Sequence, residues 1–411
     1  MSTTVSPRVL MIGWNTPAFL ALKEHHADVV SVIAPRHVRR AKSHAPDATH
    51  VVVPDDGDVE QILAGLARAE IAIDEFDFMC TIGEWPIVAA ALLAEHGKAV
   101  GMKLSAAIAL RDKFVQKRLV REAGLPVADA QMPDLLSDLD GEQLTYPIVI
   151  KPLTGAGSQD THVVSDAAEL ASLVETYQQP PRGPWLVEEF MEGEELHLDG
   201  VVRAGVVRAL SVSRYFQNVI DIKSGGLVGS VLLDPNENPD LYSKAQSLLT
   251  GVLDALGHED GIFHAEAFEK DGELTFSEVG GRLGGGVVQD IVLRRFGVDL
   301  ADEWARAALG LTPGEPAEPS KEQCGWVHLQ TPAGVAEHVP DESELLAQPG
   351  CVEAAISIGP GSQIPSFSAA SNMKAGAVII VGDSEEQVRE RTLAAAAWFS
   401  QAVTVQAPET V

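Results

Sequence analysis

The chain has 411 residues, with 30 Lys and Arg against 59 Asp and Glu, so its formal net charge is −29 with histidine neutral. Hydrophobic residues make up 45% and charged residues 22%, which is typical of globular proteins and too apolar for a disordered chain. The acidic balance argues against a nucleic-acid partner, because nucleic acid is usually held by a broad basic surface. The net charge does not exclude a small polyanionic ligand that is bound by a few local cations, backbone amides or metal ions.

The apolar runs and the cysteines exclude further classes of protein. Residues 87–94 and 375–381 are apolar runs too short to span a bilayer, so we expect no membrane partner. We see no signal peptide before the strand-like segment at residues 8–13. The three cysteines are scattered, which fits a reducing compartment and offers no zinc motif. We therefore expect a cytoplasmic protein.

The first hundred residues alternate strand and helix signals. Strands are expected over residues 8–13, 29–34, 49–53 and 76–82, and helices over residues 59–69 and 86–96. This alternation predicts a mainly parallel, doubly wound sheet. The first turn, residues 13–17, lacks the G-x-G-x-x-G pattern, so we predict no nicotinamide or flavin site. Ligands gather at the carboxyl ends of such strands, where Glu84 follows the last one.

The middle of the chain changes to an α+β pattern with antiparallel pairing. Asp112 is expected to cap a helix that stops at Gly124, and strands at residues 146–152 and 161–164 enclose a glycine-rich tip. Further strands are expected over residues 185–190, 196–202, 206–213, 262–269 and 274–279. A Pro- and Glu-rich linker at residues 310–322 then leads to what we expect to be a separate β-rich lobe.

Lys151 lies on a strand directly before a glycine-rich turn that contains Gly155 and Gly157. Glycines leave backbone N–H groups free to approach phosphate oxygens, and a nearby lysine supplies a cation. Taken alone, such a hairpin is more often only a turn.

Glu266 and Glu278 lie on two strands joined by an Asp-Gly turn, so they could project from one face of a hairpin. Two carboxylates so placed repel each other unless a divalent cation lies between them, and oxygen ligands suit magnesium. The alternative is a pair of solvent-facing glutamates. Arg282 follows in a glycine-dense loop, where its guanidinium could neutralise a phosphate or an oxyanion.

Together, in this order and spacing, these features resemble the ATP-grasp superfamily over residues 110–309. The strings that carry the resemblance are Arg111-Asp112-Lys113, Ile148-Val149-Ile150-Lys151-Pro152, Gly155-Ala156-Gly157-Ser158, Val187-Glu188-Glu189-Phe190-Met191-Glu192-Gly193, Glu266 and Glu278-Val279-Gly280-Gly281-Arg282. The resemblance implies an ATP-grasp fold of mixed α/β and α+β class. It has a Rossmann-like N-terminal domain (1–108), a small lobe (109–190) and a large lobe (191–312) around ATP, and a C-terminal β-rich lobe (313–411).

The resemblance also implies how ATP is held. Lys113 and Lys151 contact the α- and β-phosphates, and Lys151 thereby assists catalysis. The loop with Gly155, Gly157, Ser158 and Gln159 closes over the β- and γ-phosphates. The hinge formed by Glu188, Glu189, Phe190 and Met191 holds adenine, and Glu195 holds the ribose.

The metal and the reacting groups are implied in the same way. Glu266 and Glu278 bind magnesium, for which manganese could substitute. The family often adds an Asn two residues after the second Glu, but Gly280 stands there in this chain. This departure resembles the L-amino acid ligase and related dipeptide-forming branch, in which the arginine at the position of Arg282 stabilises an oxyanion.

The implied activity is that of an ATP-dependent carboxylate–amine ligase that forms an amide through an acyl phosphate, acting on amino acids or small peptide-like acids. The alternatives are a carboxylase that activates bicarbonate, a non-catalytic ATP-binding regulatory protein, and a phosphotransferase that stops at a phosphorylated product. A homodimer is expected.

Candidate substrate contacts are less specific. Glu84 could bind a substrate ammonium group, or it could be a glutamate at a helix N-terminus that the helix dipole stabilises. His264 could contact substrate or have a structural role. Arg214, Tyr215 and Lys223 could bind a substrate carboxylate, Gly280 and Gly281 would lie beside the substrate, and His197 is left as structural.

Overall fold

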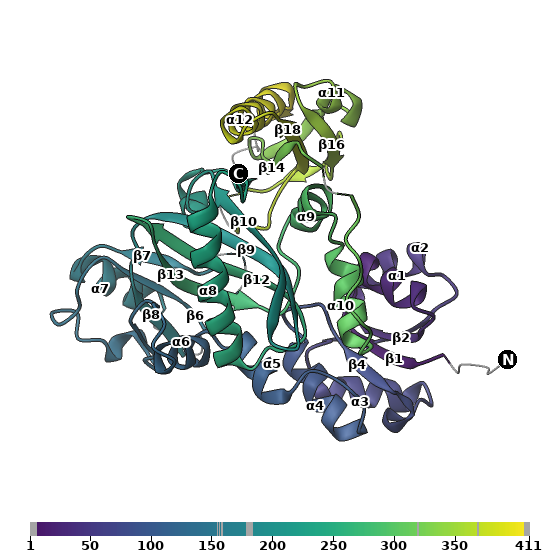
Figure 1. Ribbon diagram of the computed structural model, residues 1–411. Helices are drawn as coiled ribbons and strands as arrows, with labels where there is room; N and C mark the ends of the chain where they lie inside the picture. Colours follow the sequence, from purple (N-terminus) through teal and green to yellow (C-terminus); the bar gives the residue numbers. More distant parts are fainter. Residues whose placement is uncertain are drawn as a thin grey trace.

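The computed structural model describes residues 6–153, 155, 157, 159–177, 184–318, 320–367 and 370–406. In Figure 1 the N-terminal part (purple) lies at the lower right and the C-terminal part (yellow) lies at the top. No helix among the described residues is long and apolar enough to cross a bilayer.

The N-terminal part is the predicted parallel sheet. Its elements are β1 (Arg8–Ile12), α1 (Thr16–Glu24), β2 (Asp28–Ile33), α2 (Val38–His44), β3 (Thr49–Val52), α3 (Val59–Arg68), β4 (Phe78–Cys80), α4 (Ile87–Gly97) and α5 (Leu104–Arg111). The strand order is β3-β2-β1-β4, and every pairing is parallel. Apolar side chains alternate along β1: Met11 packs with α1, whereas Leu10 packs with α3 and α4. The sheet is therefore covered on both faces.

A small antiparallel sheet follows. Its elements are α6 (Lys113–Glu122), β5 (Ala130–Gln131), β6 (Ile148–Pro152), β7 (His162–Val164), α7 (Ala167–Thr176) and β8 (Trp185–Glu189), with strand order β5-β8-β6-β7. The Asp112 side chain accepts hydrogen bonds from the first backbone N–H groups of α6, which confirms the predicted cap. Leu170 of α7 packs on Ile148 and Trp185 of the sheet.

The central sheet has eight strands in the order β13-β12-β9-β10-β11-β14-β18-β16. These are β9 (Glu194–Arg203), β10 (Val206–Tyr215), β11 (Gly229–Leu232), β12 (Gly261–Lys270), β13 (Glu273–Gly280), β14 (Gln323–Leu329), β16 (Cys351–Ile356) and β18 (Gly376–Gly382). The long helix α8 (Pro239–Leu256) covers one face, as Figure 1 shows, and buries Leu249 and Val252 against it. Helices α9 (Val288–Phe296) and α10 (Leu300–Ala308) pack Ile291 and Trp304 with Val201 and Ile262, which point to the opposite face.

Three of the C-terminal strands extend the central sheet, whereas β17 (Gln363–Ile364), β15 (Gly334–His338) and β19 (Thr404–Gln406) form a three-stranded sheet of their own. Strand β14 pairs with β11, with Ser230 opposite Trp326, and β18 and β16 continue the same sheet. The other elements here are α11 (Glu342–Leu346) and α12 (Glu385–Ala402). A boundary near residue 313 therefore does not coincide with the edge of a sheet. The four-domain division stays a prediction.

Candidate active site

Strand alternation places the polar residues of the central sheet on the face away from α8. In β9, Leu196 and Leu198 pack in the α8 core, so Glu195, His197 and Asp199 point to the other face. Strand β12 repeats the pattern, because Ala265 and Ala267 are in that core while His264 and Glu266 alternate with them. One face of the sheet thus carries an unusual row of buried or half-buried charge.

A cavity of about 330 Å³ lies between this face and the small sheet. It is lined by most of the predicted site residues, namely Glu84, Lys113, Lys151, Gly155, Gly157, Gln159, Glu188, Glu189, Phe190, Met191, Glu195, Tyr215, His264, Glu266, Glu278 and Arg282. The two strands of the small sheet contribute Lys151 and the segment from Glu188 onward. The predicted nucleotide, metal and acyl-transfer residues therefore share one enclosed space, although Ser158 lies outside the described residues.

Buried ion pairs fix the lysines of the cavity. Lys151 Nζ lies 2.6 Å from Glu188 Oε1, and the fully buried Lys117 Nζ lies 2.8 Å from the other oxygen of Glu188. Lys113 Nζ lies 3.1 Å from Glu278 Oε2, and Lys151 Nζ lies 3.6 Å from the same oxygen. Glu188 is also the first residue of the predicted adenine hinge, and its side chain anchors two lysines.

The charges in this network depend on each other. Burial alone would raise the pKa of the Glu188 carboxyl, but the ammonium groups of Lys117 and Lys151 hold that pKa below its usual range. Burial would also raise the pKa of Glu278, but Lys113 and Lys151 hold it below its usual range. Burial lowers the pKa of Lys151, and the nearby carboxylates outweigh it, so that the net shift is upward. Lys151 is therefore held as a cation.

Glu266 and Glu278 are directly opposite each other in the pairing of β12 with β13, beside a bulge. The buried Glu195 accepts a hydrogen bond of 2.7 Å from the Val219 backbone N–H. Burial and the charge of Glu266 nevertheless raise the pKa of Glu195 to about 8. Such a group of carboxylates, not fully neutralised by the lysines, has the donor chemistry of a hard divalent cation. The residues present fit magnesium, with Glu266 and Glu278 as the candidate ligands.

Arg282 forms an ion pair through Nε with Glu84 Oε2, and its Nη1 donates to the Leu283 carbonyl oxygen at 2.9 Å. Arg111 Nη1 lies 3.8 Å from the other oxygen of Glu84. Burial would lower the pKa of Arg282, but Glu84 raises it. A side chain at Gly280 would crowd this pair, because its Cβ would lie about 3 Å from both Arg282 and Glu84. The small residue at position 280 thus leaves room for the arginine.

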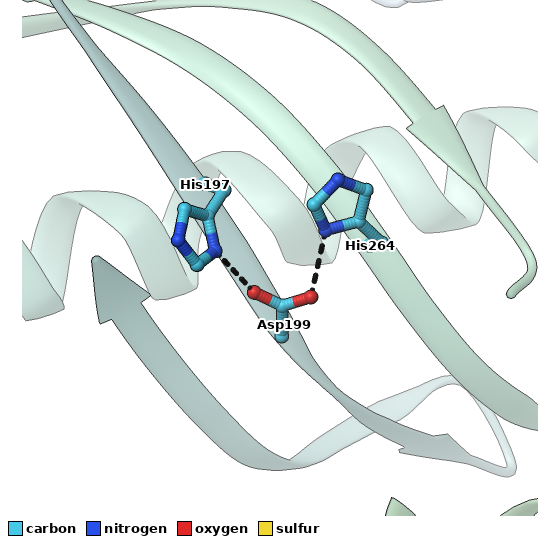
Figure 2. Close-up of side chains that lie close together, drawn as sticks. All are labelled: His197, Asp199 and His264. Carbon is cyan, nitrogen blue, oxygen red and sulfur yellow. Dashed lines mark hydrogen bonds and ion pairs between the residues drawn. The ribbon is translucent and has the colours of Figure 1, made fainter. Parts of the chain in front are cut away.

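Asp199 joins two buried histidines of neighbouring strands, as Figure 2 shows. The Nδ1 atoms of His197 and His264 donate to its two oxygens at 2.6 and 2.7 Å. Although burial alone would lower it, Asp199 raises the pKa of His264 to about 9. Within the described part of the chain, these residues form the only group of three or more His, Cys, Asp or Glu side chains whose potential metal-ligand atoms all lie within 4.8 Å of one another. Since each Nδ1 is used for a hydrogen bond to the carboxylate, the group is a hydrogen-bonded network.

Two candidate substrate contacts do not reach the cavity. Arg214 is opposite Leu196 in the pairing of β10 with β9, so it lies on the α8 face and binds Glu194 and Glu269, at 3.1 and 2.8 Å. Tyr215, the next residue, lines the cavity instead. Lys223 does not line the cavity, but its Nζ donates to the carbonyl oxygen of Thr161, which does.

The two glycines that were expected beside the substrate are separated. Gly281 is buried near Leu110, Ile87 and Met102, whereas Gly280 lines a small side cavity with Glu84 and Arg282.

Sequence reasoning missed several residues of the site. Lys117 is one turn of α6 after Lys113, and only this helical spacing could have signalled it. Asp199 sits two residues after His197 in an apolar strand, and a buried charge in such a strand was a signal that went unused. Trp326, His328 and Lys374 line the cavity from the C-terminal segment, for which the sequence offered no motif.

Comparison with known proteins agrees with this geometry. The ATP-grasp domain family matches residues 118–284. The L-arginine-specific L-amino acid ligase of Bacillus subtilis is 25% identical over 357 residues, which cover 83% of this chain and 85% of the relative. Dapdiamide A synthase of Enterobacter agglomerans is 23% identical over 210 residues, 49% of each protein.

Solved structures show the same fold over nearly the whole chain. The crystal structure of an L-amino acid ligase from Bacillus licheniformis matches with a TM-score of 0.75 and 19% identity, covering 98% of this chain and 100% of that one. An N5-carboxyaminoimidazole synthase from Aspergillus clavatus matches with a TM-score of 0.73 and 16% identity over 96% and 99% of the two chains.

Two sheets enclose a cavity that holds paired lysines and glutamates. The chain contains an ATP-grasp domain over residues 118–284, and its relatives include proteins named as ligases.

Proposed function

We propose that the protein joins a carboxylic acid to an amine at the expense of ATP, giving an amide, ADP and phosphate. The substrates are amino acids or small peptide-like acids, as the names of the L-amino acid ligase and dapdiamide synthase relatives suggest. One observation carries the proposal: the cavity that holds Lys113 and Lys151 also holds the Arg282–Glu84 pair. A phosphate site and a site for an amine and an oxyanion are thus contiguous.

Activation of the acid comes first. A carboxylate acylates poorly because its leaving group would be oxide, whereas an acyl phosphate loses phosphate instead. Lys113 and Lys151 are placed to offset negative charge on the phosphates during transfer of the phosphoryl group to the carboxylate oxygen. Magnesium or manganese, held by Glu266 and Glu278, would supply further neutralisation of the phosphate oxygens.

Amide formation follows when the amine nitrogen attacks the acyl carbon and the phosphate leaves. The oxyanion that develops on the former carbonyl oxygen is met by the Arg282 guanidinium. Glu84 is placed to hold a substrate ammonium group. In the substrate-free arrangement Arg282 and Glu84 neutralise each other, and substrate groups of opposite charge would replace that pairing.

The acyl phosphate must be kept from water. The glycine-rich loop is tied to the C-terminal segment, because the Ser371 backbone N–H donates to the Gly157 carbonyl oxygen at 3.0 Å. Lys223 makes a similar link from the 3₁₀ helix at Val219–Ser224 to the Thr161 carbonyl oxygen. Gly157, Thr161 and Ser371 line the cavity, and we propose that both segments open for substrate entry.

The test is phosphate release from ATP and magnesium with pairs of amino acids, followed by mass spectrometry of the products. We expect release only when an acid and an amine are both present, with a product mass equal to the two substrates less water. Bicarbonate-dependent release without amide formation would support the carboxylase instead. ATP binding with no release across the panel would favour a regulatory protein. The homodimer and the cytoplasmic location remain part of the proposal, and light scattering tests the dimer.

A further inference from the structure

One end of the cavity is built by the C-terminal segment, beyond the ATP-grasp match. Trp326 and His328 project from β14, with ring centroids 4.8 Å apart, and Lys374 lies next to them. Gly286 lies against both rings, because a Cβ there would be 2.8 Å from Trp326 and 2.9 Å from His328. Gly286 is on the loop that carries Arg282, so this end of the cavity adjoins the acyl-transfer groups.

Lys374 differs from the other cations of the cavity. Lys113, Lys151 and Arg282 each have a carboxylate partner, Glu278, Glu188 and Glu84 respectively. Lys374 makes no ion pair within the described residues, and its Nζ instead lies 3.1 Å from His328 Nε2. A half-buried ammonium beside a neutral ring lacks the counter-charge that such a site usually has.

His328 fixes the lysine. Its Nδ1 donates to the Ser371 carbonyl oxygen at 3.2 Å, so its Nε2 is the atom that accepts from Lys374. Burial and the Lys374 charge lower the pKa of His328 to about 3, in agreement with a neutral ring. The histidine therefore positions the ammonium group without neutralising it.

A second polar group at this end has no partner among the residues that the structure describes. The indole of Trp326 is only 2% exposed, and none of those residues accepts a hydrogen bond from its Nε1–H. A buried donor without an acceptor is costly, and native proteins rarely leave one without a function. A cation and an indole donor together match an anionic acceptor.

We propose that Lys374 and Trp326 bind a carboxylate that does not react, one carried by an amino-acid substrate. This inference rests on the proposed ligase function and names the substrate class: at least one substrate presents a second carboxylate at this end. Two sources share this chemistry, the α-carboxylate of the amine donor and the side-chain carboxylate of an acidic amino acid. A nucleotide phosphate is the competing anion.

The test compares Lys374→Met with Lys374→Arg, which keeps the charge, and with Lys321→Met, an exposed lysine of the same segment. Phosphate release is measured with L-glutamate against L-glutamine, and with each amine donor against its α-carboxamide. Loss of a charged hydrogen bond should raise KM about 10- to 100-fold for the carboxylate member of one pair. The amide member of that pair and ATP should keep their KM, and Lys374→Arg should restore most of the loss. The pair that responds identifies the source.

Trp326→Phe removes only the N–H group, and we expect a smaller rise in KM for the same substrate. Equal KM changes for carboxylate and amide members, or a change confined to ATP, would overturn the inference while leaving the ligase function intact.

Calorimetry distinguishes a failure of this inference from a failure of the ligase proposal. It measures the binding of L-glutamate, of L-glutamine and of each amine donor and its carboxamide. If wild-type protein forms no amide yet prefers the carboxylate member of a pair, and loses that preference in Lys374→Met, the inference stands and the ligase proposal falls.

Discussion

Arg282 and Glu84 form an ion pair across 198 residues of sequence and join the loop after the central sheet to the end of the N-terminal sheet. In the proposed reaction, Arg282 would meet the oxyanion and Glu84 would bind a substrate ammonium group. The position of Arg282 in the cavity therefore depends on how the N-terminal part packs against the rest of the chain.

Replacement of Arg282 by Met should abolish amide formation and spare ATP binding. Loss of one oxyanion donor costs about 100- to 1000-fold in kcat in other acyl-transfer enzymes. The assay measures kcat by phosphate release and ATP affinity by calorimetry. Glu84→Gln is the matched change on the other side of the pair, and it should mainly raise KM for the substrate with the ammonium group. Unchanged kcat in Arg282→Met would refute the role given to the arginine.

Replacement of Glu188 by Gln should destabilise the protein through the lysines that it holds. Lys117 is fully buried, and breaking such a pair by removing one partner costs about 3 kcal/mol or more in free energy of unfolding. Urea unfolding measures the change. Glu273→Gln breaks an exposed pair with Lys244 and should cost about 0.5 kcal/mol or less. Similar losses in free energy of unfolding for the two variants would contradict the prediction that the buried ion pair contributes more than the exposed one.

The same carboxylate predicts a pH dependence. Because the folded-state pKa of Glu188 lies below its ordinary value of 4.5, its ionisation stabilises the fold at pH above 4.5. That contribution is lost as the pH falls through the lowered folded-state pKa. Unfolding midpoints followed downward from pH 5 should therefore fall less steeply in Glu188→Gln than in wild type. Parallel curves would show that Glu188 does not titrate as inferred.

Glu266→Gln should weaken metal use without weakening the fold. Glu266 is a half-buried partner of Glu278 whose nearest cationic contact is His264 Nε2 at 3.8 Å, so an amide can replace it with little strain. We expect kcat to fall roughly 100-fold and the magnesium requirement to rise. A chelator should stop the wild-type reaction, and magnesium or manganese should restore it. Full activity in the chelator would remove the metal from the proposal.

Gly200→Ala should damage the site through the backbone alone. A Cβ at Gly200 would lie 2.0 Å from the Ala209 carbonyl oxygen, which belongs to the paired strand and cannot move aside. We expect a loss of about 3 kcal/mol in stability. Gly359→Ala, where nothing lies within 4 Å, should change little. Thermal unfolding of the two variants provides the comparison.

Local patterns predicted several of the elements that line the cavity. Asp112 as a cap, the hairpin around Gly155 and the pairing of Glu266 with Glu278 all follow from spacing within a few dozen residues. The face to which a strand residue points also depends on local sequence. Arg214 was nevertheless predicted to reach the cavity, whereas it points to the opposite face from its neighbour Tyr215.

Long-range contacts could not be predicted in this way. The bonds of Glu188 to Lys117 and of Lys374 to His328 join segments whose sequences carry no mutual signal. The continuation of the central sheet through β14 was missed for a similar reason, because strand order depends on the packing of the whole chain. Buried charges in apolar strands, such as Asp199, were the one available warning.

The pairing of β11 with β14 has a consequence for shortened forms of the protein. A chain cut in the linker before Gln323 would retain the residues matched by the ATP-grasp family, yet residues 229–231 would lose their partners. Their N–H and C=O groups would become an open edge able to recruit a strand from another molecule. Such a fragment should aggregate. In the full chain, the C-terminal segment covers this strand edge and thereby prevents that association.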